Sequence, residues 1–358
     1  MSSQRDSSGR PTSSGPEALR GTLGQRVRAR LIAAAARLVA ALPESPVDAL
    51  AEALGELWYR VAPGRASLGR RNLERVVRAL TARGLGGRRV ATAAVDGAAL
   101  ERMLRATFRE TVRYYLDMAR LPSQDPAEVD DRLTVETPDG VDRAFGPDKP
   151  PILVAMHFGA VEYPAMLAVA RGGPVVTPME TLGDPALQDW VRRTRATVGV
   201  EIVGLREARR ALFDALAAGK AVGLVADRHV AGGSVDVPFF GATAPLPPGP
   251  AFLAVETGRP IYLGAVRRLG RGRYAGRLSL VPTATEGDRR ARIAATTAAI
   301  AHAMEEEIAI APEQWWSLLS PIWPDIDVRA VAGSGHLEPA ATEPAATEPA
   351  APGPEAPA

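Results

Sequence analysis

The chain has 358 residues, of which 46% are hydrophobic and 23% are charged. This length and composition suffice for one large or two modest domains with a buried core, so a chain that is disordered throughout is excluded. The chain contains no cysteine, which excludes disulfide frameworks, thiolate zinc sites and cysteine nucleophiles.

The positive charge is concentrated in the N-terminal third of the chain. Residues 1–120 hold 21 arginines against 11 Asp and Glu, a balance of +10, whereas the net charge of the whole chain is only +2. A basic segment of this kind can bind phosphate groups on nucleic acid or on anionic lipid. The arginines are not interleaved with aromatic residues and no recognised nucleic-acid-binding module is present, so we expect no nucleic-acid partner.

Both ends of the chain are predicted to be disordered. Residues 1–16 are rich in Ser, Gly, Arg and Pro and lack the apolar stretch of a signal peptide. Residues 330–358 are dominated by Pro, Ala and Glu, a composition that cannot bury a core. We therefore divide the chain into a disordered N-terminus (1–16), a basic helical region (17–120), an α/β core (121–329) and a disordered tail (330–358).

Residues 25–42 have the pattern of an amphipathic helix. The longest uninterrupted apolar stretch is far shorter than the roughly 20 residues needed to cross a bilayer. The helix therefore either lies in the plane of a membrane or packs on its own domain. Further helices are predicted over 46–61, 64–83 and 92–120. The apolar stripe of the first helix consists of Val27, Leu31, Ala34, Leu38 and Ala41, with Arg26, Arg30 and Arg37 lying off it.

The pattern changes after residue 148. Four short apolar runs, PILVAMH, GPVVTPM, VEIVGL and AVGLVADR, are typical of buried strands and alternate with three amphipathic segments typical of helices. This alternation predicts an α/β fold, in which a central, mostly parallel sheet is flanked by helices and preceded by the N-terminal helical region. Functional sites in such folds collect at the carboxyl ends of the strands.

His157 ends the first predicted strand and opens the sequence HFGAVE. Glu162 lies five residues further on, and the two side chains can meet if Gly159 makes a turn and Glu162 lies in the first turn of the next helix. The carboxylate would then accept the proton of one ring nitrogen and leave the other as a general base. The alternative is a purely structural pair, in which His157 caps a strand and Glu162 stabilises a helix N-terminus.

Three blocks of sequence, in this order, resemble one group of enzymes. HFGAVE resembles the His-x4-acid motif of the glycerolipid acyltransferases. The stretch VADRHVAGGSVDVPFFGATAPLPPGPAFLAVETGRPI is similar to a block of the late acyltransferases of lipid A biosynthesis and of the phosphatidylinositol mannoside acyltransferases. The similarity runs from about residue 64 to residue 325 and includes RRNLERV, METLGDPALQDWVRRTRATVGVEIV and the closing PEQWW.

The resemblance implies an acyltransferase, of the class that transfers groups other than aminoacyl groups, that moves a fatty acyl chain from acyl-CoA to a hydroxyl of a membrane glycolipid. The closest match implies a phosphatidylinositol mannoside as acceptor, and neither cofactor nor metal is implied. His157 would be the general base, Glu162 would hold it, and backbone N–H groups at the Gly159 turn would stabilise the oxyanion. A lipid A-type late acyltransferase, a lysophospholipid acyltransferase and a non-catalytic lipid-binding protein of the same fold stay open as alternatives.

The resemblance also implies a set of substrate-binding residues. Arg192 and Arg195 would suit a phosphate, and a solvated helix face is the alternative. The family usually carries a second acid at the position of His229. The set consists of Glu180, Arg192, Arg195, Asp227, Arg228, Phe239 and Phe240.

Two pairs in this set are expected to have different roles. Asp227 and Arg228 follow a strand end, and we expect them to shape the site rather than to take part in the chemistry. Phe239 and Phe240 either line an acyl channel or pack in the core.

An enzyme of this kind must reach a lipid that lies in a membrane leaflet. The basic N-terminal region is therefore expected to attach to an anionic membrane surface. We predict a peripheral protein at the cytoplasmic face of the inner or plasma membrane, because acyl-CoA is made and used there.

Overall fold

The computed structural model describes residues 22–125, 129–146, 150–171, 173–180, 182–229, 232–270 and 272–326. The two segments predicted to be disordered, 1–16 and 330–358, lie outside these residues.

Helices make up the N-terminal region, as predicted. The predicted helix over 92–120 is in fact two helices, because the Asp96 side chain accepts a hydrogen bond from the Ala98 N–H and caps the second one. Within the described ranges, no helix combines the length and apolar character that a membrane span requires. The helices are α1 (Leu23–Ala41), α2 (Glu44–Val61), α3 (Pro63–Ala82), α4 (Gly87–Val95) and α5 (Gly97–Arg120).

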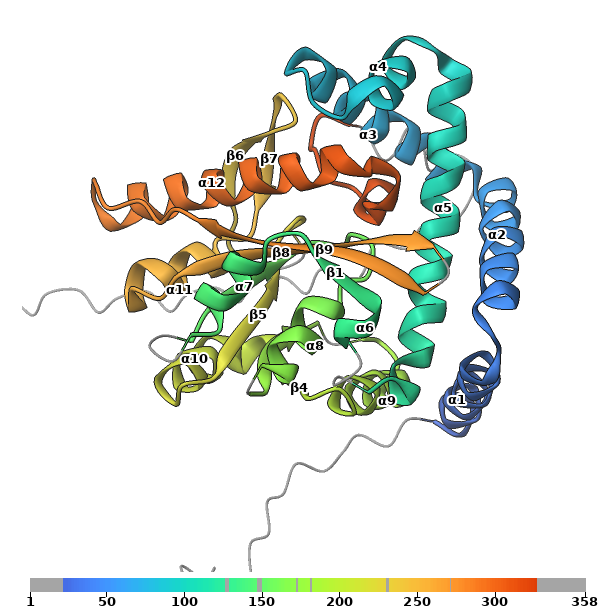
Figure 1. The fold of residues 1–358 in the computed structure, drawn as a ribbon, viewed down its shortest axis with the longest axis horizontal. Helices are drawn as coiled ribbons and strands as arrows, with labels where there is room; N and C mark the ends of the chain where they lie inside the picture. Colours follow the sequence, from blue (N-terminus) through green and yellow to red (C-terminus); the bar gives the residue numbers. More distant parts are fainter. Residues whose placement is uncertain are drawn as a thin grey trace, which may run out of the picture.

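A seven-stranded sheet forms the centre of the molecule, with the strand order β1-β9-β8-β2-β5-β3-β4 (Figure 1). The four predicted strands are neighbours in this sheet and run parallel, which confirms the parallel α/β prediction. They are β2 (Ile152–Ala155), β3 (Val175–Met179), β4 (Val200–Gly204) and β5 (Ala221–Val225).

The remaining strands extend this parallel unit. β8 (Ile261–Gly270) pairs parallel with β2, whereas β9 (Arg273–Val281) is antiparallel to β8 and pairs parallel with β1 (Leu133–Val135). A separate antiparallel hairpin consists of β6 (Val235–Phe239) and β7 (Ala242–Leu246). The sheet is therefore mixed rather than wholly parallel.

Helices cover both faces of the sheet. One apolar core contains residues of α10 (Leu205–Ala217), α11 (Gly249–Thr257) and α12 (Arg289–Ile310), together with α3, α4 and α5. The other contains residues of α6 (Val129–Arg132), α7 (Pro138–Ala144) and α8 (Tyr163–Ala170). α9 (Pro185–Ala196) lies between β3 and β4 in sequence, and short 3₁₀ helices in the described part of the chain span Leu121–Ser123, Pro312–Gln314 and Trp316–Leu319.

α1 packs against the rest of the protein with only one of its faces. It lies with α2 at one edge of the molecule, outside α5 (Figure 1). Ala36 and Val39 are buried, and Arg28 forms an ion pair with Asp184, the residue that caps the N-terminus of α9. The predicted apolar stripe faces away from these contacts, and its large side chains Val27, Leu31 and Leu38 are 46%, 65% and 66% exposed. Leu23, which was not part of the prediction, is 70% exposed.

Candidate active site

His157 and Asp227 lie opposite each other at the carboxyl ends of two neighbouring strands. β2 and β5 pair in a parallel register that sets Ala155 against Val225. His157 lies two residues after Ala155 and Asp227 lies two residues after Val225, so the register of the two strands places His157 beside Asp227. His157 Nδ1 and Asp227 Oδ1 are 2.7 Å apart, and the His157 backbone N–H donates to Asp227 Oδ2 at 3.0 Å.

Asp227 is fully buried, whereas the His157 side chain is 19% exposed. Burial alone raises the pKa of the Asp227 carboxyl, but the neighbouring charge and hydrogen bond of His157, with the hydrogen bond from the Trp315 indole, lower it to about 2. An ionised carboxylate can only accept, so Nδ1 donates its proton to Asp227, and in the neutral form of the ring Nε2 has the lone pair. This is the protonation pattern of a general base.

The prediction that Glu162 accepts the proton of the His157 ring is therefore wrong as to the partner, since Asp227 occupies that role. Glu162 immediately precedes α8, close to its predicted place in the first turn. There its Oε1 accepts from Arg195 Nε at 3.1 Å, from the Arg195 terminal nitrogen at 2.8 Å and from the Tyr114 hydroxyl at 3.3 Å. The turn after His157 leads into α8, and there the Glu162 carboxylate faces two N–H groups of Arg195 in α9.

The ion pair between Glu162 and Arg195 is largely withdrawn from solvent, with side chains that are 11% and 20% exposed. The charge of Glu162 raises the pKa of Arg195, and burial together with that same charge raises the pKa of Tyr114. Arg195 therefore stays charged and Tyr114 stays protonated, so that both donate to Glu162. The pair joins α8 to α9 beside the His157 turn.

Two adjacent tryptophans complete the surroundings of the dyad. Trp315 Nε1 donates to Asp227 Oδ2 at 2.7 Å. The Trp316 ring meets the His157 ring edge-on, with ring centroids 4.5 Å apart, and stacks on Tyr114 at the same centroid distance. The Trp316 backbone N–H also donates to the His157 carbonyl at 3.0 Å, so the 3₁₀ segment holds the histidine from two sides.

The turn at Gly159 depends on the absence of a side chain. Gly159 has φ +50°, and a Cβ atom there would lie 2.1 Å from the Val266 carbonyl oxygen. Its N–H donates to the Gln314 carbonyl at 3.0 Å, and the Ala160 N–H donates to the Val266 carbonyl at 2.9 Å. These two N–H groups of the turn are therefore not free to stabilise an oxyanion as predicted, because both already donate to backbone carbonyls.

The predicted substrate-binding residues differ in their partners and in their exposure to solvent. Glu180, which follows β3, and Arg228, which follows Asp227, approach to 3.7 Å at the carboxyl end of the sheet. Arg195 is turned inward to Glu162, whereas Arg192 is exposed, so the two arginines do not form one cluster. Glu180 and Arg228 are 41% and 30% exposed and stay available to a ligand.

Phe239 and Phe240 lie in the core, the second of the two roles considered for them. They are 0% and 2% exposed and pack on Trp315 and Trp323. Phe240 and Gly241 form the hairpin tip between β6 and β7, both with positive φ. The two phenylalanines thus brace Trp315, which in turn donates to Asp227.

Three residues of this site were not predicted from the sequence to contribute to it, namely Tyr114, Trp315 and Trp316. The available signal was the tandem tryptophan of PEQWW, which follows α12 in the sequence. Here Trp315 points to the buried acid and Trp316 to the imidazole.

The chain matches the family described as bacterial lipid A biosynthesis acyltransferase over residues 94–323. A phosphatidylinositol mannoside acyltransferase of Mycolicibacterium smegmatis is 28% identical over 305 residues, which cover 84% of this chain and 93% of that protein. A phosphatidylinositol mannoside acyltransferase of Mycobacterium tuberculosis is 30% identical over 217 residues, which cover 59% of this chain and 67% of that protein. With an imidazole and a buried carboxylate at the carboxyl end of its sheet, this chain belongs to the bacterial lipid A biosynthesis acyltransferase family.

Proposed function

We propose that the protein transfers a fatty acyl group from acyl-CoA to a hydroxyl of a phosphatidylinositol mannoside. The observation that carries the proposal is the 2.7 Å contact between His157 Nδ1 and the fully buried Asp227, with the ring itself partly open to solvent. The names of the relatives favour a mannoside acceptor over a lipid A precursor or a lysophospholipid.

In the proposed reaction His157 Nε2 takes the proton of the acceptor hydroxyl as its oxygen attacks the thioester carbonyl. The imidazolium that forms is stabilised by the Asp227 carboxylate. The attack forms the new C–O bond; collapse of the tetrahedral intermediate then restores the carbonyl and breaks the C–S bond, and the proton passes from His157 to the thiolate of CoA. The cysteine-free chain offers no thiol nucleophile, and this direct transfer needs no acyl-enzyme intermediate.

We also propose that α1 attaches the protein to an anionic membrane surface. Its exposed stripe of Leu23, Val27, Leu31 and Leu38 would lie in the acyl boundary, with the exposed Arg26, Arg30 and Arg37 at the level of the headgroups. α2 adds exposed apolar side chains at Leu54, Leu57 and Val61. The cytoplasmic face is the proposed location, because acyl-CoA is available there.

The proposal is tested by incubating the purified protein with labelled acyl-CoA and a panel of phosphatidylinositol mannosides, lipid A precursors and lysophospholipids. We expect a mannoside to gain the mass of one acyl chain. His157→Ala should abolish the transfer, and the matched variant His302→Ala should not, because His302 is 61% exposed on α12. Equal activity of the two variants would contradict the role of His157 as the base, whereas absence of transfer by the wild-type protein to any of these lipids would support a non-catalytic lipid-binding protein instead.

A further inference from the structure

A groove of about 970 Å³ lies between α10, α11, α12 and the β6–β7 hairpin, apart from the residues of the dyad. Its inner surface is mainly apolar, and arginines lie along it. The arginines are Arg209 of α10 and Arg289 and Arg290 of α12, and the apolar lining includes Leu205, Leu212, Phe252, Leu253 and Ile293.

The positive charge of this groove is organised around one aromatic ring. The guanidinium groups of Arg209 and Arg289 lie 5.6 and 5.1 Å from the centroid of the Phe252 ring. Arg289 also contacts Glu256 at 2.5 Å, whereas no carboxylate partner is found for Arg209 or Arg290 among the described residues. Asp236 is the acidic side chain of the lining. The groove therefore offers an excess of positive charge beside an apolar surface.

The inner end of the groove reaches the strands that carry the dyad. Leu224 lines it and lies on β5 three residues before Asp227. Pro178 of β3 lines it as well, and the pairing of β3 with β5 ends at Val176 and Val222, before Pro178 and Leu224. The same two residues also line a smaller pocket, of about 80 Å³, that contains Glu162 and Arg195. A ligand in the groove would thus extend toward the catalytic end of the sheet.

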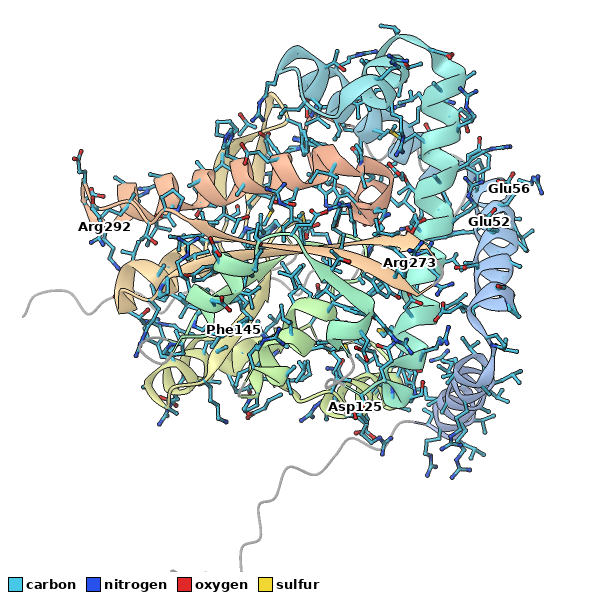
Figure 2. The ribbon with its side chains drawn as sticks, viewed as in Figure 1. Glu52, Glu56, Asp125, Phe145, Arg273 and Arg292 are labelled. Carbon is cyan, nitrogen blue, oxygen red and sulfur yellow. The ribbon has the colours of Figure 1, made fainter. Side chains whose placement is uncertain are left out.

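Two of the helices that line the groove, α10 and α11, lie on the opposite side of the molecule from α1 and α2 (Figure 1). Arg292, in the first turns of α12, lies at the opposite end of the molecule from Glu52 and Glu56 of α2 (Figure 2). A donor dissolved in water would reach this end while the acceptor is drawn from the membrane at the other.

We propose that this groove binds the donor as its CoA thioester, with the apolar surface against the pantetheine arm and Arg209 and Arg290 on the nucleotide phosphates. This inference rests on the proposed function and deepens it, because it selects acyl-CoA over an acyl carrier protein as donor. Guanidinium groups bind phosphate through paired, charge-assisted hydrogen bonds, and the long arm of CoA allows the phosphates to be remote from the thioester.

The test compares two donors that differ in their phosphates, palmitoyl-CoA and the palmitoyl thioester of N-acetylcysteamine, which has none. Arg209→Gln and Arg290→Gln should each raise the KM for palmitoyl-CoA about tenfold with kcat unchanged, since each removes a charged hydrogen-bonding partner. The KM for the short thioester should stay the same. Arg210→Gln is the matched control, because Arg210 is the next residue of α10, is 92% exposed and does not line the groove.

Calorimetric titration with CoA gives a second readout that needs no turnover, and its Kd should rise about tenfold in the same two variants. Equal changes for both thioesters, or a change in chain-length preference alone, would overturn the inference and assign the groove to the acyl chain. Transfer by the wild-type protein from an acyl carrier protein but not from palmitoyl-CoA would overturn it too. Absence of transfer from any donor would instead count against the proposed function.

Discussion

Asp227, rather than the nearer acid Glu162, holds the ring of His157. The two residues are 70 positions apart in sequence but two residues beyond a register pair of adjacent parallel strands. Glu162, only five positions from His157, instead pairs with Arg195 of α9. The site thus has two separate acidic groups, one that orients the imidazole and one that joins two helices beside it.

The ion pair of Glu162 with Arg195 should be worth more to stability than a surface pair. Glu162→Gln leaves the Arg195 charge without its partner in a largely buried place, and we expect a loss of about 2–3 kcal/mol in the free energy of unfolding. Arg195→Met should cost a similar amount, and the double variant less than the sum of the two. Denaturant unfolding of the four proteins measures this, and strictly additive losses would show that the two side chains do not interact.

The lowered pKa of Asp227 predicts a particular dependence of stability on pH. The pKa in the folded protein is about 2 against an ordinary 3.8, so the ionised form stabilises the fold. This stabilisation is fully present above the ordinary value and is lost as the pH falls to about 2. We compare the free energies of unfolding of the wild-type protein and Asp227→Asn. The advantage of the wild-type protein should shrink by about 2 kcal/mol as the pH falls from about 5 to about 2. An advantage that stays constant across this range would contradict the assignment.

Gly159 should tolerate no side chain. Alanine there would need a positive φ and would place its Cβ against the Val266 carbonyl. We expect Gly159→Ala to lower stability by about 2–4 kcal/mol and to reduce activity, since the shift would displace the turn that follows His157. Gly183→Ala is the control, because nothing lies within 4 Å of its Cβ position and its φ is not in the left-handed region. Equal melting temperatures for the two variants would refute the packing argument.

The exposed stripe of α1 should determine how strongly the protein binds vesicles. Leu31→Gln and Leu38→Gln together should weaken binding to vesicles that contain phosphatidylinositol by about hundredfold, because two large apolar contacts are lost. Leu280→Gln, which changes a 58% exposed leucine of β9, should have little effect. Sedimentation with vesicles measures the partitioning, and equal binding of all three proteins would assign the membrane contact to another surface.

The sequence alone predicts those features of the fold that depend on residues close together in the chain. The apolar stripe of α1 and the four runs that became β2 to β5 follow from local periodicity, and the predicted segments match the observed ones closely. The split between α4 and α5 was missed because a single residue, Asp96, caps a new helix inside a continuous apolar pattern. β8 and β9 were missed because no alternation with helices marks an antiparallel pair.

The partner of His157 could not be read from local spacing. It depends on β2 lying next to β5 rather than next to β3, which no single segment of sequence determines. The similar endings VAMH and VADR give no direct signal, because the observed register pairs Ala155 with Val225 and so places His157 level with Asp227 rather than with Arg228. The contact of Trp315 required in addition that the segment after α12 fold back to pair with Phe158.

The most direct measurement of the central claim compares Asp227→Asn with Glu162→Gln in the acyl-transfer assay, with both variants shown to be folded. An uncharged amide at position 227 can no longer hold the catalytic tautomer or stabilise the imidazolium, so kcat should fall on the order of 10³-fold with KM little changed. The kcat of Glu162→Gln should be at least tenfold higher than that of Asp227→Asn, because Glu162 pairs with Arg195 rather than with His157. If Glu162→Gln reduced kcat as much as Asp227→Asn, or more, Asp227 would not be the acid that serves His157.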